Sequence, residues 1–147
     1  MPDGQLIVLE RDGHWAAALH LELDSTRIRL FEIRSWAECW ERLAQCPTAL
    51  VAAELTGEGA GQMLSALSRL DREFPKAALV ALADRRLAGY RDLIREAGAV
   101  HFIISPRRLG EVSELLRRRA ERFPAAEAAD NPTDKIRENL PWNDLSE

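Results

Sequence analysis

Residues 78–82 read Ala-Leu-Val-Ala-Leu, residues 100–104 read Val-His-Phe-Ile-Ile, and the segment between them runs into Gly98. Short continuous apolar runs are typical of strands that are buried on both faces, and an amphipathic segment between two of them is typical of a βαβ unit. Glycine is common just past a helix end because it adopts the left-handed conformation without steric cost. We therefore predict two parallel strands joined by a helix over 87–97.

The same alternation continues toward both ends of the chain. Ser35 followed by Glu38 is a capping box, which predicts a helix with Trp36 and Trp40 on one face. Further strands are expected over 6–9, 28–33 and 49–53, and further helices over 13–23, 59–73 and 109–122. Five strands alternating with five helices predict an α/β domain with an open parallel sheet.

Composition narrows the function classes. The chain has 147 residues, 46% hydrophobic and 30% charged, which fits one globular domain with a short appendage. Its formal charge is −4, so there is no basic excess to neutralise nucleic-acid phosphates. No apolar run approaches membrane-spanning length and no signal peptide is evident, so we expect a cytoplasmic protein that binds neither membrane nor nucleic acid.

Cys39 and Cys46 stand about 10 Å apart on one predicted helix, too far to form a disulfide, and no ligand spacing predicts a metal site.

A change in composition near Pro124 divides the chain. Residues 1–123 form the predicted domain, and residues 124–147, with six acids and two bases, form an expected flexible acidic tail. Apolar side chains return at its end, and we interpret Leu140, Trp142 and Leu145 as a docking motif for another protein or for this domain.

Polar residues follow the predicted strands where ligands bind in open α/β sheets, at the carboxyl ends. These residues are Glu10-Arg11-Asp12 after the first strand, Glu54 after the third, Ala83-Asp84 after the fourth and Ser105-Pro106 after the fifth. Their spacing resembles that of the receiver domain of two-component response regulators. The resemblance covers about residues 5–122 and implies a flavodoxin-like (βα)5 three-layer sandwich with strand order 2-1-3-4-5.

The working positions depart from the receiver pattern. The family has an acidic pair, a phosphate-accepting Asp, a Thr or Ser and a Lys, where this chain has Glu10-Arg11, Glu54, Ala83 and Ser105. A guanidinium at position 11 would repel the magnesium ion that phosphoryl transfer requires. We therefore expect no catalytic residue, no metal and no cofactor. We also hypothesise that Arg11 pairs with Glu10 or Glu54 in place of the metal.

The resemblance places partner recognition on the fourth helix, the fifth strand and the fifth helix. The candidate residues for a protein partner, such as a kinase, or for a homodimer are Phe102, Arg107, Arg108, Arg117 and Arg118. Two alternatives stay open: a phosphorelay receiver in which Glu54 or Asp12 accepts phosphate with magnesium, and a small phosphate- or nucleotide-binding protein that uses the glycine-rich loop 57–61. We expect signalling by protein–protein interaction and no enzyme activity.

Overall fold

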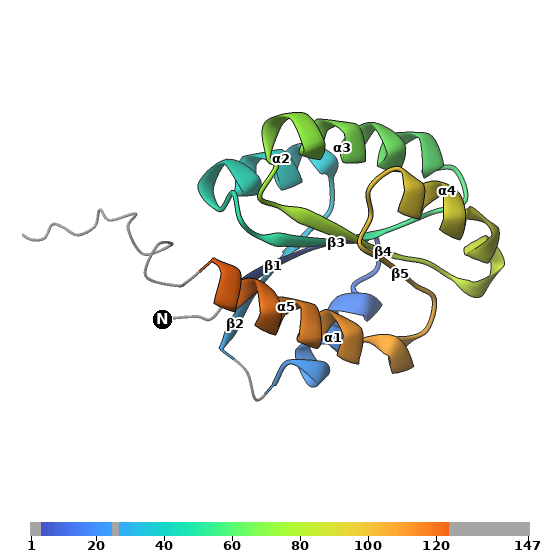
Figure 1. Cartoon of the computed structure of the whole chain (residues 1–147). Coiled ribbons are helices and arrows are strands. Elements are labelled where there is room, and N and C mark those ends of the chain that lie inside the picture. Colours follow the sequence, from blue (N-terminus) through green and yellow to red (C-terminus); the bar gives the residue numbers. More distant parts are fainter. Residues whose placement is uncertain (1–3, 25–26, 124–147) are drawn as a thin grey trace, which may run out of the picture.

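The computed structural model describes residues 4–24 and 27–123 (Figure 1). Five strands alternate with helices along the chain. The elements are β1 (Gly4–Leu9), α1 (His14–Glu22), β2 (Ile28–Ile33), α2 (Trp36–Gln45), β3 (Leu50–Glu54), α3 (Ala60–Glu73), β4 (Ala78–Leu82), the 3₁₀ helix η1 (Arg85–Tyr90), α4 (Arg91–Glu96), β5 (His101–Ile103), the 3₁₀ helix η2 (Pro106–Arg108) and α5 (Gly110–Arg122).

The five strands form one parallel sheet in the order β2-β1-β3-β4-β5. This is the predicted flavodoxin-like arrangement, and it places β1 and β3 next to each other in the middle. Leu9 pairs with Ala53 in the register, so the residues that follow these two strands emerge side by side. β2 is an edge strand, which explains why Ile33 is its only buried residue.

Helices cover both faces of the sheet, as Figure 1 shows, with α2, α3 and α4 on one face and α1 and α5 on the other. Alternate residues of each central strand supply the two apolar layers: Val51 packs into the layer under α2 and α3, and Leu50 and Ala52 pack into the layer under α1 and α5. Both layers are buried, as expected for strands that read as continuous apolar runs.

The predicted boundaries agree with the observed ones within a few residues except at the fourth helix. The structure corrects the prediction of a helix over 87–97, because residues 85–90 form the 3₁₀ helix η1 and only Arg91–Glu96 are α-helical. Gly89, a poor helix former, lies within η1, and Asp84 caps this 3₁₀ helix by accepting a hydrogen bond from the Arg86 N–H. Gly98 follows α4 with φ of +125°, in the expected left-handed region.

The capping residue of α2 is as predicted. The Ser35 hydroxyl accepts a hydrogen bond from the Glu38 N–H at 3.2 Å. The Trp36 ring stacks on Trp40, and Trp40 stacks on Phe74 from the end of α3. Three aromatic rings thus fasten α2 to α3 above the sheet.

Candidate functional site

The candidate site is the edge of the sheet formed by the carboxyl ends of β1, β3, β4 and β5. Glu10 is the best buried of its polar groups, with its side chain fully excluded from solvent. Its carboxylate accepts hydrogen bonds from the N–H groups of Trp15 at 3.0 Å and Ala16 at 2.6 Å. These are free N–H groups in the first turn of α1, where the helix dipole also favours a negative charge. Glu10 therefore caps α1 from outside the helix.

Sequence reasoning missed this use of Glu10. Gly13, immediately before α1, has φ of +88° and no side chain with which to cap the helix. A helix that begins after a glycine has no side chain at that position to accept hydrogen bonds from its first backbone N–H groups. The glycine at position 13, three residues after Glu10, was therefore the sequence feature that could have predicted this role of Glu10.

Arg11 does not occupy the place of the metal in the way we hypothesised. Within the described ranges its guanidinium forms no ion pair, neither with Glu10 nor with Glu54, and the side chain is exposed. Instead the backbone N–H of Arg11 donates a hydrogen bond to Glu54 Oε1 at 3.1 Å. The structure thus places Arg11 beside Glu54, as predicted, but joins them through the main chain.

The two remaining working positions lack the groups that would contact a phosphoryl oxygen. Ala83 is fully buried and its N–H is bonded to the Ile103 carbonyl at 2.8 Å. The Ser105 hydroxyl accepts a hydrogen bond from the Arg107 N–H at 3.2 Å, and Pro106 then opens η2. Ser105 is therefore used as a cap, where the family has a free ammonium group.

Asp84 is the acid next to Ala83. It lies in an exposed ion pair with Arg86 at 3.1 Å, and the hydrogen bonds from Arg86 hold the pKa of the Asp84 carboxyl below its usual range. Both carboxylate oxygens of Asp84 thus accept hydrogen bonds from Arg86 at the start of η1.

The donor set does not fit a magnesium ion. Magnesium requires several oxygen ligands in octahedral geometry, with one or two carboxylates free to bind it. Both Glu10 oxygens and one Glu54 oxygen already accept backbone N–H bonds, and Asp12 is a separate exposed acid. Across residues 4–24 and 27–123, no group of three acidic, histidine or cysteine side chains is arranged to hold a metal.

The basic residues of α5 are mostly paired. Arg108 bonds Glu111 at 2.6 Å, Arg118 bonds Glu114 at 3.2 Å, and Arg117 contacts both Glu114 and Glu121. These are the helical i,i+3 and i,i+4 pairs that the spacing predicts. Arg107 is exposed and has no ionic partner in the described part of the chain.

Phe102, the candidate aromatic partner residue, is buried at 6% exposure beneath α4. The guanidinium of Arg91 lies 5.6 Å from its ring centroid. In this structure Phe102 therefore offers no surface to a partner, which corrects its predicted placement among the partner-binding residues. The other predicted contacts, Leu140, Trp142 and Leu145, lie outside the described residues.

Arg119 has a structural role that the sequence did not reveal. Its guanidinium donates hydrogen bonds to the carbonyls of Thr48, at 2.7 Å, and Lys76, the residues that precede β3 and β4. Burial lowers the pKa of Arg119. One side chain of α5 thus ties down the loops that lead into β3 and β4.

The comparisons with known proteins bear on the fold. No family model matches the chain, and no curated protein matches it. Several solved structures, however, match the chain. A response regulator from Thermotoga maritima is 20% identical, with a TM-score of 0.65, and the match covers 80% of this chain and 98% of that one.

Two further structures give the same result. A CheY-like protein (tadZ) from Pseudomonas aeruginosa PAO1 is 20% identical with a TM-score of 0.64, covering 82% of this chain and 96% of that one. A CheY-like receiver domain protein from Methanospirillum hungatei JF-1 is 16% identical with a TM-score of 0.60, covering 82% and 98%. The chain therefore has the response-regulator receiver fold.

No helix in the described ranges is long and apolar enough to cross a membrane.

Proposed function

We propose that this chain is a degenerate receiver that signals by binding another protein and does not depend on phosphorylation. The observation that carries the proposal is the buried Glu10 carboxylate, whose two oxygens are bonded to the first turn of α1. A carboxylate held in this way contributes to the stability of α1 and is not free to bind a metal ion.

The other working positions support the same proposal. Phosphoryl transfer needs positive charge and hydrogen-bond donors around the transferred group. Ala83 has no hydroxyl group and Ser105 has no ammonium group. The backbone N–H of Arg11 is bonded to Glu54, and the permanent positive charge of the Arg11 side chain disfavours a cation that would have to bridge Glu54 and the phosphate.

The surface of α4, β5 and α5 is the proposed partner surface. Leu93 on α4 is 47% exposed and offers an apolar contact on this surface. Arg107, on η2, is exposed and has no ionic partner among the described residues. A surface that presents both an apolar side chain and a free positive charge suits a protein partner, including a second copy of this chain.

Phosphorylation can be tested directly with the full chain. We expect incubation with magnesium and acetyl phosphate to add no phosphoryl group by intact-mass measurement, and beryllofluoride to leave the melting temperature unchanged, while a functional receiver run in parallel responds to both. An adduct lost in Glu54→Ala, or in Asp12→Ala, would overturn the proposal and establish the phosphorelay alternative at that residue. A melting shift with nucleotides alone would instead support binding at the loop 57–61.

The partner surface needs its own measurement. Sedimentation of the wild type and of Leu93→Glu tests whether α4 mediates self-association. We expect Leu93→Glu to weaken binding to the partner, or self-association, by at least tenfold, whereas Leu21→Glu, on α1, leaves it unchanged. Equal effects of the two variants would contradict the assignment of α4.

A further inference from the structure

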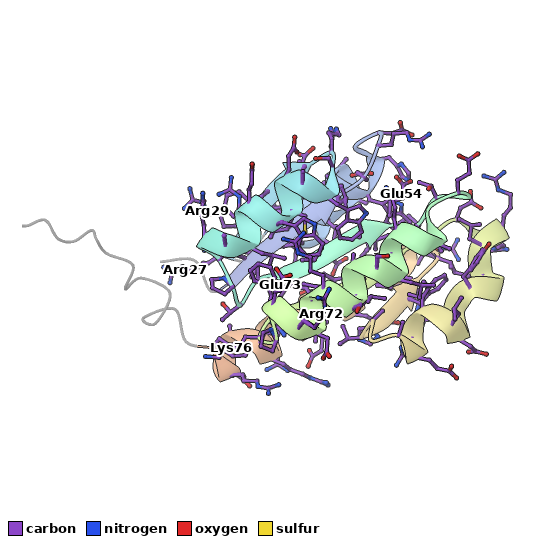
Figure 2. All side chains as sticks on the ribbon, turned by 90° about the horizontal axis from the view of Figure 1, so that it is seen from above. Arg27, Arg29, Glu54, Arg72, Glu73 and Lys76 are labelled. Atoms are coloured by element: carbon purple, nitrogen blue, oxygen red, sulfur yellow. The ribbon has the colours of Figure 1, made fainter. Side chains whose placement is uncertain are left out.

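Unpaired positive charge gathers at the edge of the sheet opposite the candidate site. We define the basic edge as five exposed residues near the amino ends of the strands: Arg27, Arg29, Arg72, Lys76 and Arg122. None of the five forms an ion pair with an acid in the described part of the chain. Figure 2 shows Arg27, Arg29 and Lys76 toward one end of the molecule, and Glu54 toward the other.

Few acids offset this charge. Glu73, labelled in Figure 2 beside Arg72, is already bonded to Arg69 at 3.0 Å, and Asp71 is exposed on the same helix. The contrast with the neighbouring arginines is informative, because those at 108, 117 and 118, on η2 and α5, pair with glutamates of α5. In the described part of the chain, the basic edge therefore brings together five positive charges without a carboxylate partner, whereas Arg11 and Arg107 are unpaired at the opposite edge.

A hollow whose exposed lining is about half polar and half apolar opens beside the basic edge. It has a volume of about 430 Å³ and lies between the last turns of α3, the start of β4 and Gly98. Leu64, Leu67, Leu70, Pro75 and Ala77 supply its apolar lining, and Ser68 and Asp71 add polar groups. Because Pro75 and Ala77 flank Lys76 in the sequence, the hollow borders the basic edge at Lys76. Its volume is ample for one aromatic side chain.

The chain itself carries a segment that matches this surface in charge and in apolar content. Residues 124–147 hold six acids and two bases, a net charge of −4, and include Trp142. The segment begins directly after α5, whose last turns lie at the basic edge: Arg119 donates a hydrogen bond to the Lys76 carbonyl, and Arg122 belongs to the edge.

We propose that residues 124–147 dock in cis on the basic edge, with the indole ring of Trp142 in the hollow against its leucine side chains. Eighteen residues, 124–141, lie between Phe123 and Trp142 and give a reach of up to about 60 Å, so chain length does not prevent contact. Attachment to the same chain gives the segment a local concentration on the order of millimolar, which makes even a weak site occupied. The proposal is independent of whether the receiver is phosphorylated.

Nuclear magnetic resonance of the full chain tests the proposal through the indole N–H of Trp142, assigned by its loss in Trp142→Phe. We expect this resonance to be shifted from its random-coil position and protected at low salt. Arg72→Glu combined with Lys76→Glu should return it to the random-coil position, as should 0.5 M salt, because exposed charge pairs are screened. Ser68→Phe, which fills the mouth of the hollow, should displace it without changing any charge.

The matched control is Arg85→Glu combined with Arg107→Glu, which makes the same change in net charge at the opposite edge of the sheet. We expect this control to leave the Trp142 resonance where it is in the wild type. A random-coil Trp142 in the wild type at low salt would overturn the proposal. So would an equal response to both charge reversals, or a shift that depends on protein concentration, which would indicate docking between copies instead.

Discussion

The backbone N–H of Arg11 lies 3.1 Å from Oε1 of Glu54, so the loop after β1 is bonded to the end of β3 across the middle of the sheet. A main-chain donor is present whatever the side chain at position 11. The Glu54 carboxylate therefore links the end of β3 to the loop after β1, and this hydrogen bond does not involve the Arg11 guanidinium.

This relationship separates two otherwise similar substitutions. Arg11→Ala should change the free energy of unfolding by no more than about 0.5 kcal/mol, because the exposed guanidinium has no partner to lose. Glu54→Ala should cost about 1 kcal/mol, because the Arg11 N–H loses its acceptor. Urea denaturation of both variants measures the difference. Equal losses would revive the hypothesis of a side-chain ion pair.

Glu10→Gln should destabilise the fold by about 1–3 kcal/mol. The amide can still accept one hydrogen bond, but it loses the negative charge at the start of α1 and turns a donor toward the Trp15 and Ala16 N–H groups. Asp12→Gln is the control, because Asp12 is exposed and next to the same helix. If Glu10→Gln unfolds no more easily than this control, Glu10 is not the cap of α1.

The strands and their order could be predicted because a parallel sheet buried on both faces leaves continuous apolar runs in the sequence. The resemblance also identified which residues gather at the site, and β1 and β3 do bring Arg11 and Glu54 together. What those side chains do could not be predicted, because Glu10 is bonded to N–H groups that exist only once α1 has formed. The hydrogen-bond donors to Glu10 and Glu54 are backbone N–H groups, and the sequence does not show which backbone groups will lie next to a given side chain.

The same limit explains the fourth helix and Arg119. The 3₁₀ helix η1 begins where the Asp84 side chain accepts a hydrogen bond from the Arg86 N–H, and it contains Gly89. Side-chain hydrogen bonds of this kind compete with the regular α-helix, and the spacing of apolar residues does not reveal them. Arg119 looks like its neighbours in an arginine-rich run, and only the packing of α5 across the sheet brings it to the Thr48 carbonyl.

Gly98→Ala should destabilise the protein by about 1–2 kcal/mol. Gly98 has φ of +125°, which L residues rarely adopt, whereas the added methyl group would meet Leu67 at an ordinary contact distance of 3.9 Å, so the cost comes from the backbone. Gly89→Ala is the matched control in the neighbouring η1, where nothing lies within 4 Å of the new carbon and φ is not positive. Thermal melting of the two variants should show a loss for Gly98→Ala alone; a comparable loss for both would mean that backbone strain is not the cause.

Cys39 provides a prediction of how stability changes at high pH. Burial raises the pKa of its thiol from 9.0 to about 12, so the folded state keeps the proton that the unfolded chain releases. The contribution of Cys39 is therefore complete below pH 9 and declines as the pH rises from 9 toward 12. By pH 10 the loss from this one group amounts to about 1 kcal/mol.

The comparison of wild type with Cys39→Ala isolates this effect from other groups that titrate in the same range. The variant is less stable at neutral pH because it leaves a small cavity, but its stability should fall less steeply between pH 8 and 10. Alkylation adds a second readout, since only a thiolate reacts: Cys39 should be modified on unfolding, and the half-buried Cys46 faster than Cys39 in the native state. Parallel pH profiles for the two proteins, or rapid native modification of Cys39, would show that the thiol is more accessible than its buried position on α2 indicates.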